Sequence, residues 1–524
     1  MSRGATMGGT WPFAIAALAV AAFGVSVVHA WPFTVDDTYI TLRYSRNVAD
    51  GLGPTFNATG PRAEGYTTFS WMVALVLPHA LHLDALVAAK VLGVLASAGT
   101  LVVAARWAWA EARAAAPDDR EGAAWAGATA ATCLAAVPAT AVHAVSGMET
   151  ALFTLLLTSA FATASAHVRG RHDVATRLCA LALLLGLTRP EGNLAALLVI
   201  GTTVVLIPKQ GRRALLLRAA LGWALPVAGY ELWRRTYYGL WFPLPFYVKL
   251  ATPGLFPGWP DVLAWLRAPV LHFAVLLLPA LVRPARSLLP ALVAAAALTA
   301  FFVLPQHQMG YDHRYLAPLD PTLGVLAGVG VARVLARLSV ARTFPRAPPR
   351  ISRPLGNLLA ASALAIAAGL EGVDARAVIG GEADYGLGLE HAHAHLGREL
   401  LALDQPDGRL VISDAGAVPY LSGWWTLDLV GLNDAVIATT GRRDSAWVLG
   451  QRPDVVVFAS PRTDRVEPWD WNPWEPALYD ACVSAGFARV GLERFADDYW
   501  LWVMAMPDSE IGRRFARQGA QERR

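Results

Sequence analysis

The chain has 524 residues, of which 55% are hydrophobic and 16% are charged, and its formal net charge is +4. Soluble domains carry about 25% charged residues, so this shortfall and the long apolar runs indicate a membrane protein. The modest charge, without a basic aromatic stripe, argues against a nucleic-acid partner. Three cysteines make no disulfide framework.

The first apolar run, 11–31, is predicted to cross the membrane as a helix. Val28-His29-Ala30 also resembles a cleavage site, so a signal peptide is the alternative. The length of the run and the missing polar region before that site favour an anchor that stays attached. In both cases the segment after residue 33 lies outside.

The first outer loop, residues 34–66, begins with two adjacent carboxylates, Asp36 and Asp37. Ile40 and Tyr44 follow at helical spacing, which predicts a short amphipathic helix lying along the membrane surface. Placing a charged carboxylate at this boundary costs free energy, so the pair is a candidate functional site. The alternative is that both residues only stabilise the N-terminus of the helix.

Further apolar runs of spanning length predict a helix bundle, because in hydrocarbon each segment must satisfy its own backbone polar groups. They lie near 85–106, 122–142, 148–167, 174–188, 192–208, 214–233, 268–283, 287–304, 318–338 and 355–370. The shorter run 67–82 is expected to dip in without crossing, which gives about eleven crossings. A misplaced loop later in the chain is the alternative.

Arginine in short loops predicts the orientation, because cytoplasmic loops carry an excess of Lys and Arg. The basic loops 169–177, 209–218 and 333–353 are therefore placed in the cytoplasm. The outer side then receives 34–66, 143–149, 189–192, 235–262, 305–317 and everything after the last helix.

From about residue 374 the pattern becomes that of a soluble α/β domain. Strands are predicted at 410–414, 454–458 and 499–506, and a helix at 475–484. By the orientation of the bundle, this domain is expected on the outer side of the membrane.

Two groups of side chains stand out in this domain. His391, His393 and His395 form a run within a predicted helix, for which a solvated face is preferred over a metal site. A cluster of tryptophans could stack on sugar rings, although packing or contact with the membrane surface is the preferred interpretation. The cluster comprises Trp469, Trp471 and Trp474.

Short motifs are spread over most of the chain. They are Asp36-Asp37, Glu64-Gly65-Tyr66-Thr67, Gly147-Met148-Glu149-Thr150, Arg189-Pro190-Glu191-Gly192, Pro243-Leu244-Pro245-Phe246-Tyr247-Val248-Lys249, His313-Arg314-Tyr315, Asp414-Ala415-Gly416 and Asp428-Leu429-Val430-Gly431-Leu432. The set resembles the GT-C superfamily of polytopic glycosyltransferases, and in particular the mycobacterial terminal β-(1→2)-arabinofuranosyltransferase family.

The resemblance implies a mainly α fold with two parts. Residues 1–373 would form a transmembrane bundle of about 11–13 helices, and residues 374–524 an extracytoplasmic α/β domain. A multi-pass protein of the inner (plasma) membrane is expected. The implied activity is transfer of a sugar from a polyprenyl-phosphate donor to an extracytoplasmic glycan or lipid acceptor.

The resemblance also implies roles for individual residues. Asp36 is expected to be the base, with Asp37 as its partner, because a carboxylate can take the proton of an attacking hydroxyl. The leaving phosphate needs cations, and three are predicted on the outer side: Arg189, Lys249 and Arg314. For each cation the alternative is a side chain that snorkels to the interface.

Further residues are assigned to substrate binding: Arg43, Glu64, Tyr66, Glu149, Glu191 and His313. No cofactor is expected, since no Gly-rich phosphate loop is present; a divalent metal stays open, as do the sugar and the acceptor. The rival hypothesis is a polytopic transporter or lipid flippase, although no internal repeat supports it. A non-catalytic relative is disfavoured by the intact Asp pair.

Overall fold

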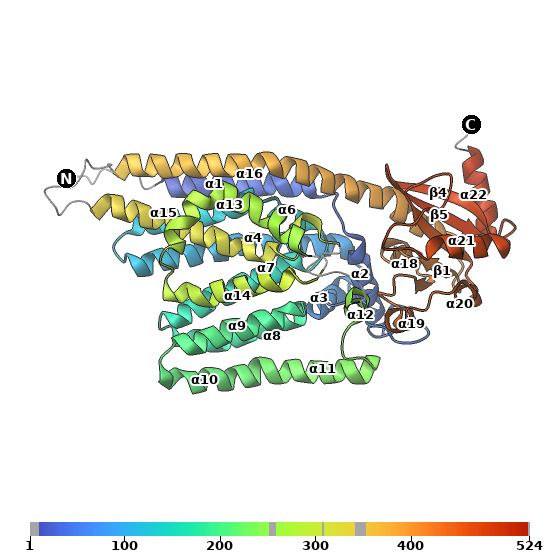
Figure 1. Ribbon diagram of the computed structural model, residues 1–524, viewed down its shortest axis with the longest axis horizontal. Helices are drawn as coiled ribbons and strands as arrows, with labels where there is room; N and C mark the ends of the chain where they lie inside the picture. Colours follow the sequence, from blue (N-terminus) through green and yellow to red (C-terminus); the bar gives the residue numbers. More distant parts are fainter. Residues whose placement is uncertain (1–9, 251–257, 306–308, 341–352, 522–524) are drawn as a thin grey trace.

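The computed structural model describes residues 10–250, 258–305, 309–340 and 353–521. Most helices run along the long axis of the molecule, and a small domain built on a sheet covers one end of them (Figure 1). Three stretches of the loops discussed above lie outside the described residues, namely 251–257, 306–308 and 341–352.

The bundle consists mainly of apolar helices. Its first half contains α1 (Trp11–Ala30), α3 (Phe69–Ala80), α4 (Ala85–Ala115), α5 (Arg120–Ala136), α6 (Pro138–Val145), α7 (Thr150–Val168), α8 (Ala175–Thr188) and α9 (Glu191–Leu206). Its second half contains α10 (Lys209–Ala219), α11 (Leu225–Tyr238), α12 (Leu244–Leu250), α13 (Trp259–Leu281), α14 (Leu289–Phe302), α15 (Asp320–Val340) and α16 (Arg353–Leu389).

Within the described residues, six helices are long and apolar enough to cross a membrane, or up to eight if each of two bent pairs is one span. The predicted transmembrane bundle is thereby confirmed. The count of about eleven crossings stays a prediction, because three apolar helices are shorter than a full span: Phe69–Ala80, Glu191–Leu206 and Arg286–Phe302.

The ends of the bundle agree with the predicted loop pattern. Helix α10 and the C-terminal end of α15, which adjoin two of the basic loops, lie opposite the sheet domain (Figure 1). Helix α3 contains Pro78 and lies at the end near the sheet domain, and its dip into the membrane stays a prediction.

The sheet has five strands, β1 (Arg409–Ile412), β2 (Trp425–Asp428), β3 (Val455–Ser460), β4 (Ala488–Ala496) and β5 (Tyr499–Ala505), in the order β2-β1-β3-β5-β4. Strand β1 is parallel to β2 and β3, whereas β5 is antiparallel to β3 and β4. Every residue of β3 is buried, as an apolar central strand requires. The accompanying helices are α17 (His395–Leu401), α18 (Ala417–Ser422), α19 (Ala435–Thr440), α20 (Ser445–Gly450), α21 (Glu475–Ser484) and α22 (Glu510–Gln521).

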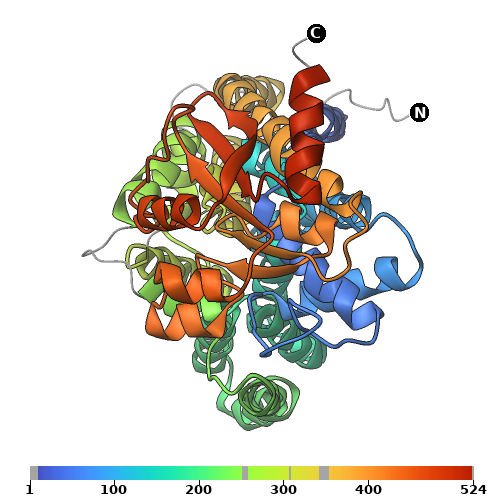
Figure 2. The same ribbon diagram turned by 90° about the vertical axis from the view of Figure 1, so that its right-hand side faces the viewer.

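The sheet domain is joined to the bundle by one continuous helical path. Helix α16 passes residue 374 without a break, continues through the π-helix η7 (Glu390–Ala394) and enters α17. The domain boundary expected at 374 therefore falls inside α16. Seen from this end, the orange and red segments of the domain cover the ends of the bundle helices (Figure 2).

Helix α2 (Asp36–Ala49) corresponds to the predicted short helix, but it lacks the exposed polar side expected of an amphipathic surface helix. Ten of its 14 residues are buried, on polar and apolar sides alike. The reason is that the α/β domain covers it: the ring of Tyr39 lies 5.6 Å from that of Tyr420, and Tyr44 Oη donates to Asn433 at 3.3 Å. The helix thus lies between the bundle and the domain.

Candidate functional site

Asp36 begins α2 and is fully engaged by the α/β domain. Its Oδ2 accepts the backbone N–H of Gly416 at 2.9 Å, and its Oδ1 accepts that of Ala417 at 2.8 Å. A Cβ at Gly416 would collide with Asp36, so glycine permits this close approach. Burial raises the pKa of Asp36 to about 6, against the effect of nearby His393. Both oxygens are occupied in holding the domain on α2.

Asp37 has a different environment one residue later. Its side chain is half-buried and makes no hydrogen bond or ion pair with any residue that the structure describes. Burial raises the pKa of Asp37, and the positive charges of Arg314 and Lys249 oppose that rise. Asp37 is therefore a carboxylate without a fixed partner, within electrostatic reach of two cations.

Those cations belong to a buried cluster centred on Glu149, at the N-cap of α7. Arg314 Nη2 donates to Glu149 Oε1 at 3.1 Å. Arg189 Nε lies 3.6 Å from the same oxygen and 2.7 Å from Glu191 Oε1. The structure thus brings together Glu149, Arg314 and the neighbouring pair Arg189 and Glu191, which come from three separate parts of the sequence.

Tyr315 completes this cluster, and sequence reasoning gave it no role. The centre of its ring lies 5.3 Å from Arg189 Cζ, 5.4 Å from Lys249 Nζ and 5.8 Å from Arg314 Cζ. Its hydroxyl accepts a hydrogen bond from Lys249 Nζ at 3.1 Å. The ring of Tyr315 therefore lies close to three cations from separate helices or helix ends, with Lys249 at its hydroxyl end. In the sequence, its place in the His313-Arg314-Tyr315 motif was the signal that could have indicated a role for Tyr315.

The backbone before Arg314 is strained. Met309, Asp312 and His313 adopt left-handed conformations with φ of 53°, 39° and 56°, which non-glycine residues rarely take. The 3₁₀ turn η5 (Tyr311–His313) ends there, directly before the arginine. Such strain is concentrated at functional sites. His313 adjoins the cluster through this turn.

The cluster leaves buried polar atoms without partners. Glu149 Oε2, Arg189 Nη1 and Arg314 Nε make no hydrogen bond within the described residues. An unpaired buried donor on a charged group costs free energy, so these two guanidinium donors are suited to an anion supplied by a ligand. Arg189, Lys249 and Arg314 thus form a cationic cradle, and Asp37 lies within electrostatic reach of two of these cations.

Three predicted binding residues have other partners. Arg43 is buried and donates to the carbonyl oxygens of Phe56, Pro419 and Trp424 at 2.6 to 2.7 Å, which ties α2 to the α/β domain. Glu64 accepts from Arg234 Nε at 3.1 Å. Burial raises the pKa of Glu64 to about 7, against the effect of Arg234.

The hydroxyl of Tyr66 lies 3.1 Å from that of Tyr238, and its ring packs 4.9 Å from Tyr44. Glu64 and Tyr66 therefore hold the first outer loop against α11 and α2, and no described contact joins either residue to the cationic cradle.

The α/β domain adds a third carboxylate to the site. Asp414 Oδ2 lies 2.8 Å from His393 Nε2 and accepts from Tyr499 Oη at 2.7 Å. His391 and His395 are exposed, as expected of a solvated face, but His393 is buried in the π-helix. Residues two apart lie on nearly opposite sides of a helix, so His393 points inward while His391 and His395 share the exposed side. No group of three metal-ligating side chains occurs among the described residues.

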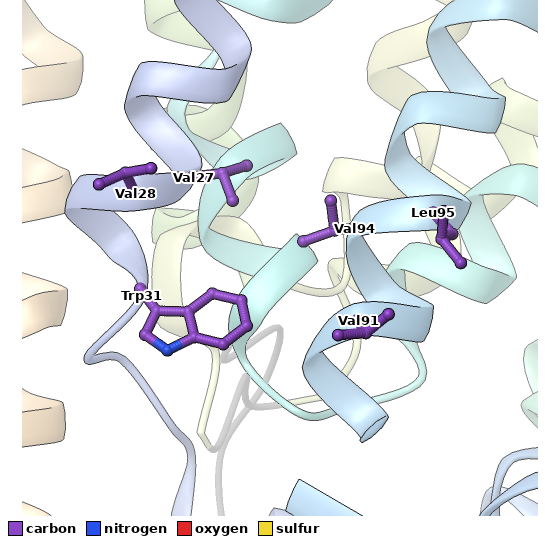
Figure 3. Close-up of a pocket in the computed structure, with 6 residues that line it drawn as sticks. All are labelled: Val27, Val28, Trp31, Val91, Val94 and Leu95. Carbon is purple, nitrogen blue, oxygen red and sulfur yellow. The ribbon is translucent and has the colours of Figure 1, made fainter. Parts of the chain in front are cut away.

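A separate apolar groove of about 390 Å³ lies between α1 and α4 (Figure 3). Its walls are formed by Val27, Val28, Trp31, Val91, Val94 and Leu95. None of these residues belongs to the cradle or carries a reactive group. The groove is suited to a hydrocarbon chain rather than to a sugar.

Comparison with known proteins gives two matches in sequence. A family described as a domain of unknown function (DUF8728) matches residues 384–504, which cover most of the α/β domain. The terminal beta-(1->2)-arabinofuranosyltransferase of Mycobacterium tuberculosis is 32% identical over 236 residues, 42% of this chain. The matched stretch covers 36% of that protein, so the chain spans little more than a third of this relative's length.

Solved structures match nearly the whole chain. ArnT from Cupriavidus metallidurans, bound to undecaprenyl phosphate, has a TM-score of 0.60 at 16% identity, covering 94% of this chain and 98% of that one. The Archaeoglobus fulgidus oligosaccharyltransferase, tethered to an acceptor peptide, has a TM-score of 0.51 at 10% identity. That match covers 86% of this chain and 69% of the other.

Proposed function

We propose that this chain, which has the GT-C fold, is a glycosyltransferase that moves a sugar from a polyprenyl-phosphate donor to an extracytoplasmic acceptor. The observation that carries the proposal is Asp37, a carboxylate without a partner among the described residues, within electrostatic reach of the cationic cradle. The protein would act in the plasma (inner) membrane, with the α/β domain on the outer side.

The contacts of the two aspartates favour roles opposite to those expected from the sequence. Both carboxylate oxygens of Asp36 accept hydrogen bonds from the N–H groups of Gly416 and Ala417, so its role is to position the domain. Asp37 is free to accept the proton of an acceptor hydroxyl. The base would therefore be Asp37, with Asp36 as its positioning neighbour.

The cradle would stabilise the leaving group. As the acceptor oxygen attacks the anomeric carbon, the bond from that carbon to the phosphate oxygen breaks, and the polyprenyl phosphate leaves with the electron pair. The hydroxyl proton goes to Asp37, and the negative charge on the phosphate is met by Arg189, Lys249 and Arg314. A cation-stabilised phosphate suits a transition state with oxocarbenium character at the sugar.

The test compares the wild type with two aspartate variants of the full chain, reconstituted into nanodiscs. Radiolabelled sugars on polyprenyl phosphate are supplied with cell-envelope glycan, and transfer is measured for the wild type, Asp37→Asn and Asp50→Asn. Asp50 is exposed at the opposite end of α2, which makes it a matched control. We expect Asp37→Asn to lower kcat by about 10² to 10⁴, while Asp50→Asn retains wild-type rates.

Undecaprenyl phosphate binding, measured in parallel, should survive in Asp37→Asn because the cradle is intact. A transfer rate that is unchanged in Asp37→Asn would remove the proposed base. Movement of polyprenyl phosphate across liposomes, with no labelled product and no effect of Asp37→Asn, would favour the transporter or flippase and overturn the proposal.

A further inference from the structure

Three aromatic rings of the α/β domain form a continuous stack beside the site. The ring of Tyr499 lies 4.7 Å from that of Trp469 at an angle of 25°, and the ring of Trp469 lies 5.8 Å from that of Trp471 at 13°. Trp471 ends the stack and is 40% exposed, whereas Trp469 and Tyr499 are half-buried. The stack therefore leads from solvent into the domain.

The inner end of the stack reaches a carboxylate. Tyr499 donates its hydroxyl to Asp414 Oδ2, and His393 holds the same oxygen from another side. Asp414 Oδ1 makes no hydrogen bond with any residue that the structure describes. Two residues later in the chain, Gly416 donates to Asp36, and Asp414 lies within electrostatic reach of Asp37. The exposed ring of Trp471 is thus connected through Trp469 and Tyr499 to a carboxylate that lies within electrostatic reach of the proposed base.

Building on the proposed function, we propose that this stack and Asp414 form the acceptor subsite, and that the acceptor is a neutral saccharide chain. Flat aromatic faces suit the apolar faces of sugar rings, and a carboxylate oxygen fixed by two neighbours accepts hydrogen bonds from sugar hydroxyls. A hydroxyl held by Asp414 would place the next ring of the chain towards Asp37.

Charge beside the stack disfavours the other occupants. Asp470 separates the two tryptophans in the chain, and Asp497 and Asp498 directly precede Tyr499; all three are exposed, and Asp497 is paired with Arg494. Carboxylates at this position repel an anionic acceptor and the negatively charged surface of a membrane. An uncharged, hydroxyl-rich chain satisfies both the rings and the carboxylates.

Binding can be tested without donor and without chemistry. The full chain in nanodiscs is mixed with tetrasaccharides of arabinan, galactan, mannan and glucan, and saturation-transfer NMR reports which sugar protons contact the protein. We expect at least one tetrasaccharide to bind, and Trp471→Ala to weaken that binding about ten-fold. Trp447→Ala is the matched control, because Trp447 lies in the same domain, is partly exposed and contacts Arg442 rather than the stack.

Kinetics supply the second readout. Trp471→Ala should raise the acceptor KM far more than it lowers kcat and should leave the donor KM unchanged. Asp414→Asn should raise the acceptor KM and lower kcat, with thermal unfolding measured to confirm that the variant folds.

The outcomes separate this inference from the proposed function. Saccharide binding that depends on Trp471, in a chain that transfers no sugar, would uphold the subsite and refute the transferase. Transfer with an acceptor KM that is unchanged in Trp471→Ala would refute the subsite and uphold the transferase. Failure of every tetrasaccharide to bind the wild-type chain would also overturn the subsite.

Discussion

Glu111 and Glu149 are buried glutamates of the bundle, 3% and 0% exposed, and each is paired with arginine. At Glu111, near the end of α4 away from the α/β domain, both oxygens are used. Oε1 accepts from Ser165 at 2.5 Å and pairs with Arg169, and Oε2 accepts from Ser287 at 2.5 Å.

At Glu149 the arrangement is incomplete. Oε1 faces Arg314 and Arg189, whereas Oε2 and one donor on each arginine have no partner within the described residues. A buried ion pair gains from its charges only when the remaining hydrogen bonds are made. The Glu111 cluster meets that condition within the chain, whereas the Glu149 cluster leaves two guanidinium donors and one carboxylate oxygen open to a ligand. The first is expected to serve stability and the second ligand binding.

The largest expected effect tests the Glu149 cluster. Arg314→Gln removes a cation from the leaving phosphate and should lower kcat by about 10² to 10³. Undecaprenyl phosphate binding should weaken as well, measured by native mass spectrometry in nanodiscs. The control is Arg169→Gln, which should retain wild-type kcat per folded molecule. Equal losses of kcat in the two variants would erase the distinction between the clusters.

A somewhat smaller effect, on stability rather than rate, is expected at the other cluster. Glu111→Gln leaves the charge of Arg169 without its partner and should lower the free energy of unfolding by about 3 kcal/mol. Thermal unfolding in detergent measures the loss. Glu121→Gln, which alters the more exposed pair with Arg353, should cost less than about 1 kcal/mol. A selective fall in kcat for Glu111→Gln would contradict the structural role.

The pH dependence sharpens the contrast further. Burial raises the pKa of Asp37 above its ordinary value of 3.8, so the proposed base stays protonated to a higher pH than an exposed aspartate. The rate should therefore rise with pH through that raised pKa, about ten-fold per pH unit on the acid side. Because the charge of Arg314 opposes the increase in the pKa of Asp37, Arg314→Gln should move the rising part of the pH–rate profile to higher pH. If the rate rises with the ordinary pKa of an aspartate in both the wild type and Arg314→Gln, Asp37 is not the base.

The smallest effect concerns the ring that gathers the cations. Tyr315→Phe keeps the ring but removes the oxygen that accepts from Lys249. A single hydrogen bond contributes about 1 kcal/mol, so kcat/KM should fall about five-fold. Tyr315→Leu, which also removes the aromatic face, should cost more. If Phe and Leu were equivalent at this position, the ring would have no part in holding the cations.

The sequence predicted the elements better than their surroundings. Helix 475–484 and the strands near 410, 455 and 500 correspond to α21, β1, β3 and β5. Strands β2 and β4 were not predicted: β2 has four residues, and β4 reads ARVGLERFA, with charges and a glycine that hide its pattern. Short or polar strands are stabilised by their neighbours in the sheet, and that information is not local.

The same limit applies to the site. The motifs predicted three cations on the outer side, and the structure places Arg189, Lys249 and Arg314 around the ring of Tyr315. The opposite roles favoured for Asp36 and Asp37 could not be predicted, since they depend on backbone N–H groups 380 residues away. The burial of Arg43 was missed for the same reason: its partners, Pro419 and Trp424, lie in the other domain.

The orientation of the α/β domain relative to the bundle depends on the length of helix α16. It has 37 residues and leads through η7 into α17 without a flexible joint. Each residue inserted into such a helix turns the downstream domain by about 100° and advances it by about 1.5 Å. The number of residues in α16 therefore sets which rim of the sheet faces Asp36, and with it the alignment of Asp36 with the aromatic stack.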